Sequence, residues 1–248
     1  MNLKNFFKKG TSSTKNNRDL TGKINKDIDQ NLGYDLEDEA NENIKIIRKN
    51  TMLPYRRLVT LYQQAVYCEQ ANINGSFTEC GVWKGGAVGL MALANLNHGN
   101  NYRDLYLFDS FDDIGEPDPS IDGERAVRDA EIYGGKNESE LTGKVNKPMK
   151  GAYDAFGGYG SLKENKNLLQ KVIQYPSNYI NYNKGWFEDT LPKVAKNMDK
   201  IAILRLDGDW YKSIKVCLEY LYPKVVKGGF VIIDDYNYYK GCTKALDE

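Results

Sequence analysis

Short apolar runs that end in acidic or glycine residues alternate with helical periodicity from about residue 51 onward. Runs of about four to seven apolar, largely β-branched residues bounded by turn signals are typical of buried strands. They predict strands at 77–82, 105–111 and 179–185, and in the stretches that end at Asp207 and Asp234. Helical spacing predicts helices at 58–66, 86–96, 162–172, from 190, and at 210–222. This alternation predicts an α/β fold with a doubly wound sheet and right-handed crossovers.

Two stretches lie outside this alternation. Residues 1–50 are polar, basic at first and then acidic, and predict a solvated leader that is partly disordered or loosely packed. Residues 112–160 show no sustained period and are rich in glycine, proline and aspartate at their start. A loop of this length in a compact domain is usually functional or disordered. We therefore expect one domain over residues 51–248, with a lid-like insertion at 112–160.

Composition narrows the function classes. Lys+Arg and Asp+Glu both number 34, so the formal net charge of zero gives no electrostatic argument for nucleic acid or an anionic membrane. The four cysteines form no CxxC pair, which favours a reduced, cytoplasmic protein without a structural zinc site. No apolar run approaches about 20 residues, so no membrane span is expected. The single histidine, His98, falls in a loop-like stretch, and histidine-based catalysis is not expected.

Acidic residues cluster where two of the predicted strands end. Asp207 and Asp209 follow one apolar run, and Asp234 and Asp235 end the next. In an open parallel sheet, ligands bind at the carboxyl ends of strands, so these carboxylates can converge although they are distant in sequence. Acids at strand ends also cap helices and turns. Two pairs on consecutive strands favour a site, and their mutual repulsion favours a cation among them.

The first predicted strand ends in a glycine-rich turn, Glu79-Cys-Gly-Val-Trp-Lys-Gly-Gly86. Gly81 allows a tight turn, and Gly85 lets the backbone approach a ligand closely. The spacing is ExGxxxG rather than GxGxxG, and Val82 and Trp83 would crowd a pyrophosphate. An NAD-dependent oxidoreductase is therefore disfavoured. S-adenosylmethionine, which has no pyrophosphate, suits such a turn.

Two further polar residues occupy predicted strands. Asp109 ends the second strand, where an acid can accept hydrogen bonds from ribose hydroxyls or can cap the next element. Arg205 points to the same face of its strand as Asp207, because strand side chains alternate. A buried arginine needs a partner, so we expect a carboxylate beside Arg205, with Glu79 as the candidate.

The motifs occur in one order along roughly residues 51–245. They are Thr51-Met52, Gly75–Gly86, Phe108-Asp-Ser-Phe111, Gly185-Trp-Phe-Glu-Asp-Thr-Leu-Pro192, Leu204-Arg-Leu-Asp-Gly-Asp209, Leu221-Tyr-Pro223 and Gly228–Tyr236. In this combination the chain resembles the TylF/MycF family of magnesium-dependent, S-adenosylmethionine-dependent sugar O-methyltransferases. The fourth and fifth motifs are specific, whereas the glycine turn alone is not. The resemblance implies a Rossmann-like class I methyltransferase sheet.

The resemblance also implies roles for individual residues. The implied metal ligands are Asp207, Asp234 and Asp235, and the implied general base is Asp209. The implied contacts to the methionine end of the cofactor are Glu79, Gly81, Val82, Trp83 and Gly85. Asp109 and Ser110 would hold the ribose, and Gly185 and Trp186 would lie near the adenine.

The chemistry is consistent with these implied roles. Mg²⁺ prefers oxygen ligands and keeps several waters, so two neighbouring sugar hydroxyls could displace water from it. The metal would orient the diol and lower the pKa of the acceptor hydroxyl. Asp207 would assist as a ligand, and Asp209 would take the proton, a contribution of about 10²–10⁴-fold. The expected partner is a glycoside or saccharide.

The chain departs from the family pattern near its C-terminal residue. Methyltransferases of this fold continue into a final antiparallel strand pair, which we expect to be absent here. The strand 230–233 would then be exposed, unless the polypeptide is a fragment or associates into a homo-oligomer. The alternative to an active enzyme is a truncated or non-catalytic S-adenosylmethionine-binding module.

Overall fold

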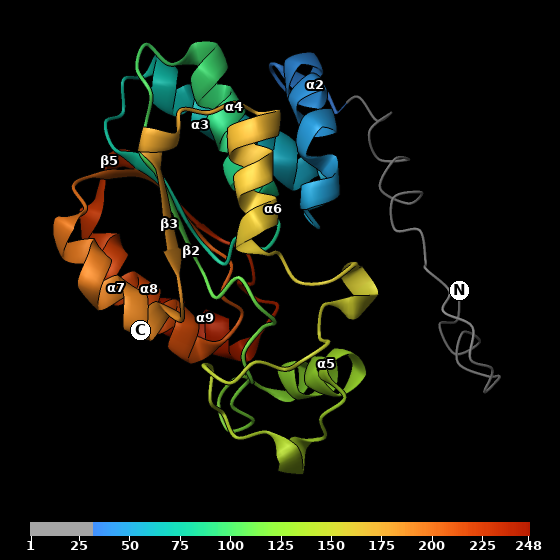
Figure 1. The fold of residues 1–248 in the computed structure, drawn as a ribbon. Helices are drawn as coiled ribbons and strands as arrows, with labels where there is room; N and C mark the ends of the chain where they lie inside the picture. The colour runs from blue at the N-terminus through green and yellow to red at the C-terminus, as the bar shows by residue number, and fades with distance from the viewer. Residues whose placement is uncertain (1–31) are drawn as a thin grey trace, which may run out of the picture.

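The computed structural model describes residues 32–248, and its centre is one parallel sheet with the strand order β3-β2-β1-β4-β5 (Figure 1). Its strands are β1 Ser76–Cys80, β2 Leu105–Asp109, β3 Ile180–Lys184, β4 Ile201–Leu206 and β5 Val225–Ile233. Every residue of β1 and β4 is buried, whereas β3 and β5, at the two edges, are partly exposed. This arrangement confirms the predicted doubly wound α/β fold.

Helices cover both faces of the sheet (Figure 1). One layer packs around Phe77, Leu107 and Ile203 and contains α2 Glu37–Ile47, α3 Tyr55–Gln70, α4 Gly86–His98 and α6 Leu162–Lys166 with the π-helical turn Asn167–Val172. The other packs around Cys80, Leu204 and Leu206 and contains α7 Phe187–Val194, α8 Tyr211–Leu221 and α9 Lys240–Asp247. The sheet thus separates two cores, as an open parallel sheet requires.

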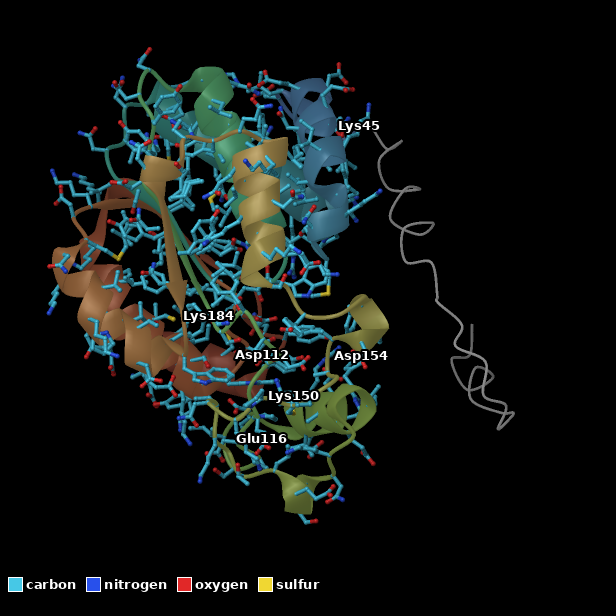
Figure 2. The ribbon with its side chains drawn as sticks, in the orientation of Figure 1. Lys45, Asp112, Glu116, Lys150, Asp154 and Lys184 are labelled. Atoms are coloured by element: carbon cyan, nitrogen blue, oxygen red, sulfur yellow. The ribbon has the colours of Figure 1, made fainter. Side chains whose placement is uncertain are left out.

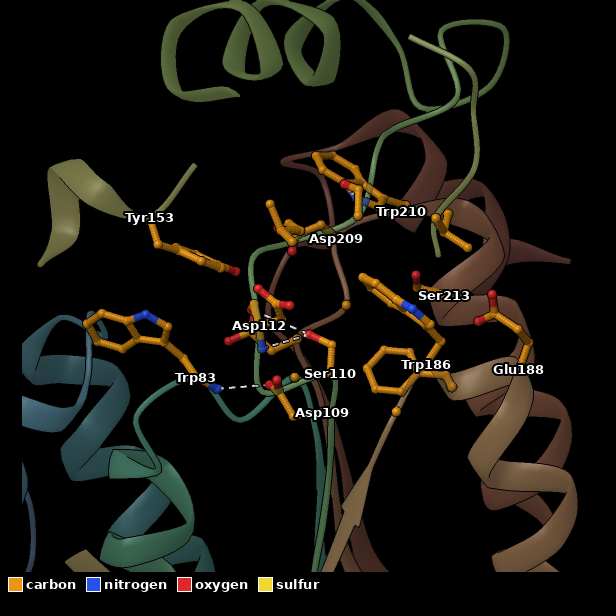
Figure 3. A pocket seen from close by; sticks show the side chains of 18 residues that line it. Trp83, Asp109, Ser110, Asp112, Tyr153, Trp186, Glu188, Asp209, Trp210 and Ser213 are labelled. Carbon is orange, nitrogen blue, oxygen red and sulfur yellow. Dashed lines mark hydrogen bonds between the residues drawn. The ribbon is translucent and has the colours of Figure 1, made fainter. Parts of the chain in front are cut away.

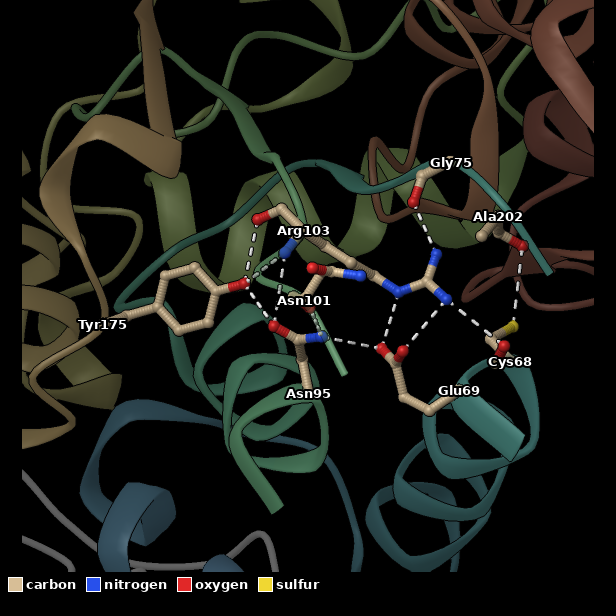
Figure 4. A network of polar contacts seen from close by, with 8 residues as sticks. All are labelled: Cys68, Glu69, Gly75, Asn95, Asn101, Arg103, Tyr175 and Ala202. Atoms are coloured by element: carbon tan, nitrogen blue, oxygen red, sulfur yellow. Dashed lines mark hydrogen bonds and ion pairs between the residues drawn. The ribbon is translucent and has the colours of Figure 1, made fainter. Parts of the chain in front are cut away.

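A buried polar network fixes the amino ends of the central strands (Figure 4). The Arg103 guanidinium donates to Glu69 and to the carbonyl of Gly75, immediately before β1. Asn95 donates to Glu69 at 3.0 Å, and Tyr175 donates to Asn95 at 2.6 Å. Because these groups satisfy one another, we assign the network to the scaffold, at the opposite end of the strands from the predicted ligand site.

The folded domain begins before residue 51, where the sequence predicted its N-terminal boundary. Helix α2 places Ala40, Ile44 and Ile47 in the core with no exposed area, so residues 37–47 belong to the folded domain. The polar positions hid this stripe, because apolar residues recur on only one face of an otherwise charged helix. The prediction for residues 1–31 lies outside the described residues. His98, which was expected in a loop, instead ends helix α4, and its Nε2 lies 2.6 Å from a carboxylate oxygen of Glu39.

Three other local predictions need correction. Residues 112–160 contain a helix, α5 Glu124–Gly134, whose buried stripe consists only of Ala126 and Ala130 and was therefore hard to recognise. Helix α7 begins at Phe187, before the predicted start at residue 190, and contains Pro192 in its interior. Strand β5 begins at Val225, earlier than the predicted strand 230–233, and contains Gly228 and Gly229, where the pairing with β4 shifts register.

Edge strand β5 pairs only with β4 within residues 32–248, and its residues 230–233 are half-buried. The partial exposure expected for this strand is therefore confirmed for the described part of the chain. Homo-oligomer formation stays a prediction. The four cysteines are free and buried, and none of the helices described here is long and apolar enough to cross a bilayer.

Glu116 lies within the 112–160 segment (Figure 2), and its carboxylate is buried and joins several parts of that segment. Lys136 and Lys147 pair with Oε1, and the backbone N–H and hydroxyl of Thr142 donate to Oε2. Burial raises the pKa of Glu116, but the hydrogen bonds from Lys136 and Thr142 outweigh burial and lower it to about 2. These ion pairs and hydrogen bonds of Glu116 link parts of the segment to one another and do not involve the sheet.

Replacing Glu116 with Gln is expected to reduce the free energy of unfolding by about 1.5–3 kcal/mol at pH 7, the typical contribution of a hydrogen bond to a charged group. Because the folded pKa lies below the ordinary value of 4.5, the carboxylate stabilises fully above about pH 4.5. This stabilisation is lost as the pH falls toward 2. Urea unfolding at pH 7 and pH 3 should therefore show a smaller difference between wild type and variant at pH 3.

The matched control is Glu138→Gln, an exposed glutamate of the same segment, which should change stability by less than about 0.5 kcal/mol. A Glu116→Gln effect that is the same at both pH values would contradict the assignment of its stabilisation to the ionised carboxylate.

Candidate active site

The predicted site residues gather where the strand order reverses, at the carboxyl ends of β1 and β4. Glu79 of β1 lies directly opposite Arg205 of β4 in the sheet register. Gly81, just after β1, has a φ of +85°, and a Cβ there would lie 1.7 Å from the backbone oxygen of Asp207. Glycine is therefore required at position 81 for the two strand ends to approach each other.

Arg205 links the acids that the sequence singled out. Its side chain is 3% exposed and donates to Glu79, to Asp207 Oδ2 at 2.9 Å and to Asp234 Oδ1. The expected pairing with Glu79 is confirmed, and two further carboxylates join it. Burial raises the pKa of Glu79, Asp207 adds to that rise, and Arg205 opposes it. One buried cation thus partly balances three acids.

Asp207, Asp234 and Asp235 form a compact carboxylate cluster. Each offers an oxygen, and these oxygens all lie within 4.8 Å of one another. Asp235 Oδ2 is buried and has no hydrogen-bond partner among the described residues. Arg57, which reaches over from α3, donates to Asp234 Oδ2 at 2.8 Å, so both oxygens of Asp234 already contact guanidinium groups.

The cluster carries more negative charge than its arginines balance. Burial and the neighbouring carboxylate of Asp234 raise the pKa of Asp207 to about 6, although Arg205 opposes the shift. Burial and the carboxylates of Asp207 and Asp234 raise the pKa of Asp235 to about 8. A divalent cation would relieve this repulsion and engage the unpartnered oxygen of Asp235. The donor set, all carboxylate oxygen, suits Mg²⁺.

Asp209 lies between two adjoining cavities. It follows Asp207 by two residues and adopts a left-handed conformation with φ of +55°, which aspartate tolerates better than most residues. Burial and the carboxylates of Asp235 and Asp207 raise its pKa well above the ordinary range. The two cavities share four lining residues: Gly81, Trp83, Asp207 and Asp209. Asp209 is therefore accessible from both sides.

The first cavity is lined by aromatic side chains and by the predicted ribose and adenine residues (Figure 3). Ser110, Gly185 and Trp186 line it together with Asp109, so the structure brings these four predicted positions together. The second cavity, of about 320 Å³, is the acidic one, lined by Glu79, Val82 and the three clustered aspartates. Gly85, by contrast, lines neither cavity; it lies beside Asn165 as the residue that precedes helix α4.

Asp109 supports the glycine turn directly. Its Oδ2 accepts hydrogen bonds from the backbone N–H of Val82 at 2.6 Å and from that of Trp83 at 3.1 Å, the second of which is drawn in Figure 3. Its Oδ1 accepts from Phe111 at 2.6 Å. Asp109 thus caps the following turn, as considered from the sequence. A ribose hydroxyl would have to bind the lone pairs that remain on the Asp109 carboxylate. The ribose contact stays a prediction.

The glycine turn is also tied to the end of the 112–160 segment. Trp83 Nε1 donates to the carbonyl of Gly158 at 3.1 Å, and Lys84 Nζ donates to the carbonyl of Gly157 at 2.8 Å. Asn165 returns a hydrogen bond to the carbonyl of Trp83 at 2.7 Å. This segment is therefore attached to the glycine turn and forms one wall of the site.

Sequence reasoning missed three residues that shape the site. Arg57 stands on an exposed helix face, where periodicity gives no signal for a contact with Asp234. Asp113, 4% exposed, accepts hydrogen bonds from Gly151 and Tyr153 and so orders the segment, but a run of loop aspartates gave no reason to prefer it. Tyr153 lines the first cavity, but it falls in the stretch 112–160, whose lack of periodicity gave no signal for such a position.

Strand order, glycine turn and strand-end acids together define a Rossmann-like class I methyltransferase fold. The family model described as macrocin-O-methyltransferase (TylF) matches residues 23–248, so the chain belongs to this family of O-methyltransferases. The resemblance found from the motifs is thereby confirmed.

Individual relatives agree with this assignment. The chain is 34% identical over 199 residues to demethyldecarbamoylnovobiocin O-methyltransferase of Streptomyces niveus, covering 80% of this chain and 67% of that protein. It is 32% identical over 191 residues to 8-demethyl-8-(2,3-dimethoxy-alpha-L-rhamnosyl)-tetracenomycin-C 4'-O-methyltransferase of Streptomyces olivaceus, covering 75% and 62%. The solved structure of the O-methyltransferase NovP matches with 32% identity and a TM-score of 0.59, covering 80% of this chain and 72% of that one. The chain thus spans about two thirds of the length of the two curated relatives.

Proposed function

We propose that this protein transfers a methyl group from S-adenosylmethionine to a saccharide hydroxyl, with Mg²⁺ held by carboxylates and Asp209 as the general base. The observation that carries the proposal is the cluster of Asp207, Asp234 and Asp235 beside Asp209, at the junction of two cavities. The predicted cofactor contacts line both cavities and meet at the glycine turn, and Asp209 lines both cavities beside the carboxylate cluster, so the cofactor and the acceptor would meet near Asp209.

The chain's own groups suit the cofactor. Glu79 Oε2 is buried without a hydrogen-bond partner among the described residues, so it could accept from the ammonium of the methionine end. Gly81, Val82 and Trp83 would follow that end, and the other nucleoside contacts would come from the first cavity: Asp109, Ser110, Gly185 and Trp186. Bound S-adenosylmethionine would supply an electrophilic methyl carbon, whose bond to sulfur breaks as the acceptor oxygen attacks.

The carboxylate cluster suits the metal and the proton transfer. Asp207, Asp234 and Asp235 would hold Mg²⁺, which would lower the pKa of a nearby acceptor hydroxyl. Asp209 would accept the proton of that hydroxyl at a carboxylate oxygen. Burial and the carboxylates of Asp235 and Asp207 raise the pKa of Asp209, which makes its ionised form a stronger proton acceptor than an ordinary aspartate. Proximity of the two bound reactants would contribute up to roughly 7–11 kcal/mol.

A saccharide acceptor is supported by the relatives, and the walls of the site suggest how the reaction would be shielded. One relative's name specifies a hydroxyl on a rhamnosyl group. Here the 112–160 segment covers the first cavity with Ile114, Gly115, Val145 and Tyr153. We therefore assign this segment the role of a lid that shields the reaction from water.

The experiment is methyl transfer from methyl-labelled S-adenosylmethionine with Mg²⁺, to a panel of glycosides that carry neighbouring hydroxyls, beginning with methyl α-L-rhamnopyranoside. Mass spectrometry should find a mass gain of one methyl group on at least one glycoside. Calorimetry measures cofactor binding on the same protein. Cofactor binding without transfer to any glycoside would contradict the proposed reaction and leave an S-adenosylmethionine-binding module.

A further inference from the structure

Tyr153 projects from the 112–160 segment into the first cavity, with its hydroxyl end directed toward Asp209 (Figure 3). Its ring centroid lies 6.4 Å from that of Trp83, and the two planes are tilted by 43°. The two rings therefore do not stack on each other, and each lines a separate part of the first cavity. Tyr153 and Trp83 frame the approach to the general base.

The backbone of Tyr153 is held on both sides. Its N–H faces the buried Asp113 at 3.4 Å, and its carbonyl accepts hydrogen bonds from Phe156 and Gly158, each at 2.9 Å. Gly158 in turn accepts from the Trp83 indole. The ring is thus positioned by the same contacts that tie the segment to the glycine turn, and its location does not depend on contacts of the hydroxyl.

The Tyr153 hydroxyl itself has no protein hydrogen-bond partner within residues 32–248. Burial raises the pKa of Tyr153, and among the carboxylates Asp209 contributes more to the rise than Asp109 or Asp207. The group stays protonated and can donate a hydrogen bond. Tyr153 is partly exposed where it lines the first cavity, so its hydroxyl can donate to a ligand there, and an acceptor that reaches Asp209 from this cavity would lie before that hydroxyl.

We propose that Tyr153 is an acceptor-positioning residue: its hydroxyl hydrogen-bonds the saccharide next to the hydroxyl that Asp209 deprotonates. The inference rests on the proposed function and adds a contact from the lid to the acceptor. Asp209 would take the proton, whereas Tyr153 would only fix the orientation of the sugar. The cofactor, held by the glycine turn and the first cavity's far wall, would not need this hydroxyl.

The test is steady-state kinetics of Tyr153→Phe, which keeps the ring and removes only the hydroxyl. The probe is the glycoside that wild-type protein methylates fastest in the panel. The KM for this glycoside should rise about 3–10-fold, the effect of losing one neutral hydrogen bond. The kcat should change by less than about twofold, and calorimetry should give the same Kd for S-adenosylmethionine as in the wild type.

The matched control is Tyr159→Phe, an exposed tyrosine of the same segment, which should leave both constants unchanged. An unchanged glycoside KM in Tyr153→Phe overturns the inference, and so does a weakened Kd for S-adenosylmethionine at unchanged KM, which would place the hydroxyl on the cofactor. A wild-type protein that methylates no glycoside overturns the proposed function and this inference together. An active wild type with an unaffected variant overturns the inference alone.

Discussion

Asp207→Asn is expected to reduce kcat/KM for methyl transfer by about 10³-fold or more. Metal activation of an oxygen supplies several kcal/mol of transition-state stabilisation, and roughly 4 kcal/mol corresponds to 10³-fold. Asn lacks the charge that Asp207 contributes to the cluster with Asp234 and Asp235. Excess EDTA should abolish wild-type activity in the same assay, and added Mg²⁺ should restore it.

Metal binding gives a readout that does not depend on turnover. Because the cluster carries uncompensated negative charge, Mg²⁺ should raise the melting temperature of the wild type and not that of Asp207→Asn. Asp199→Asn is the matched control, since Asp199 is exposed and precedes β4 at the other end of the sheet. Full wild-type activity in EDTA would refute the metal-assisted mechanism, even if cofactor binding were intact.

Arg205→Ala is expected to have the largest effect on stability, about 3–5 kcal/mol, because it removes the only arginine that contacts Glu79 among the described residues. The carboxylate of Glu79 is 1% exposed and would remain buried beside Asp207 and Asp234. For a domain of this size, each kcal/mol corresponds to roughly 2–4 °C, so the melting temperature should fall by about 6–20 °C. Differential scanning calorimetry without added metal measures the shift.

Arg57→Ala provides the contrast. Arg57 also pairs with Asp234, but its side chain is 53% exposed, and exposed ion pairs contribute only about 0–1 kcal/mol. Removing both members of the buried pair, in Glu79→Gln/Arg205→Met, should cost less than Arg205→Ala, because the carboxylate of Glu79 no longer stays buried without its arginine. Equal destabilisation by Arg57→Ala and Arg205→Ala would show that burial does not set the energy of this cluster.

Local sequence patterns were sufficient to predict the positions of the strands and of most of the acidic residues in the site. Asp207 and Asp234 were found because each ends an apolar run, and parallel strands bring such ends to one edge of a sheet. The pairing of Glu79 with Arg205 followed from the alternation of side chains along strands. Patterns failed where the apolar signal was weak: α5 buries only two alanines, and α2 carries its core residues on one face of a charged helix.

The sequence by itself determined the doubly wound fold, the family and the acids at the strand ends, because strand and helix periodicities and short motifs are local properties of the chain. Only the tertiary structure decided what surrounds those acids. Arg57, Asp113 and Tyr153 come from a helix and a long segment whose positions depend on packing against distant strands. The carboxylates at the centre are thus readable from sequence, whereas their counter-charges and the wall that faces Asp209 follow from contacts that no local pattern encodes.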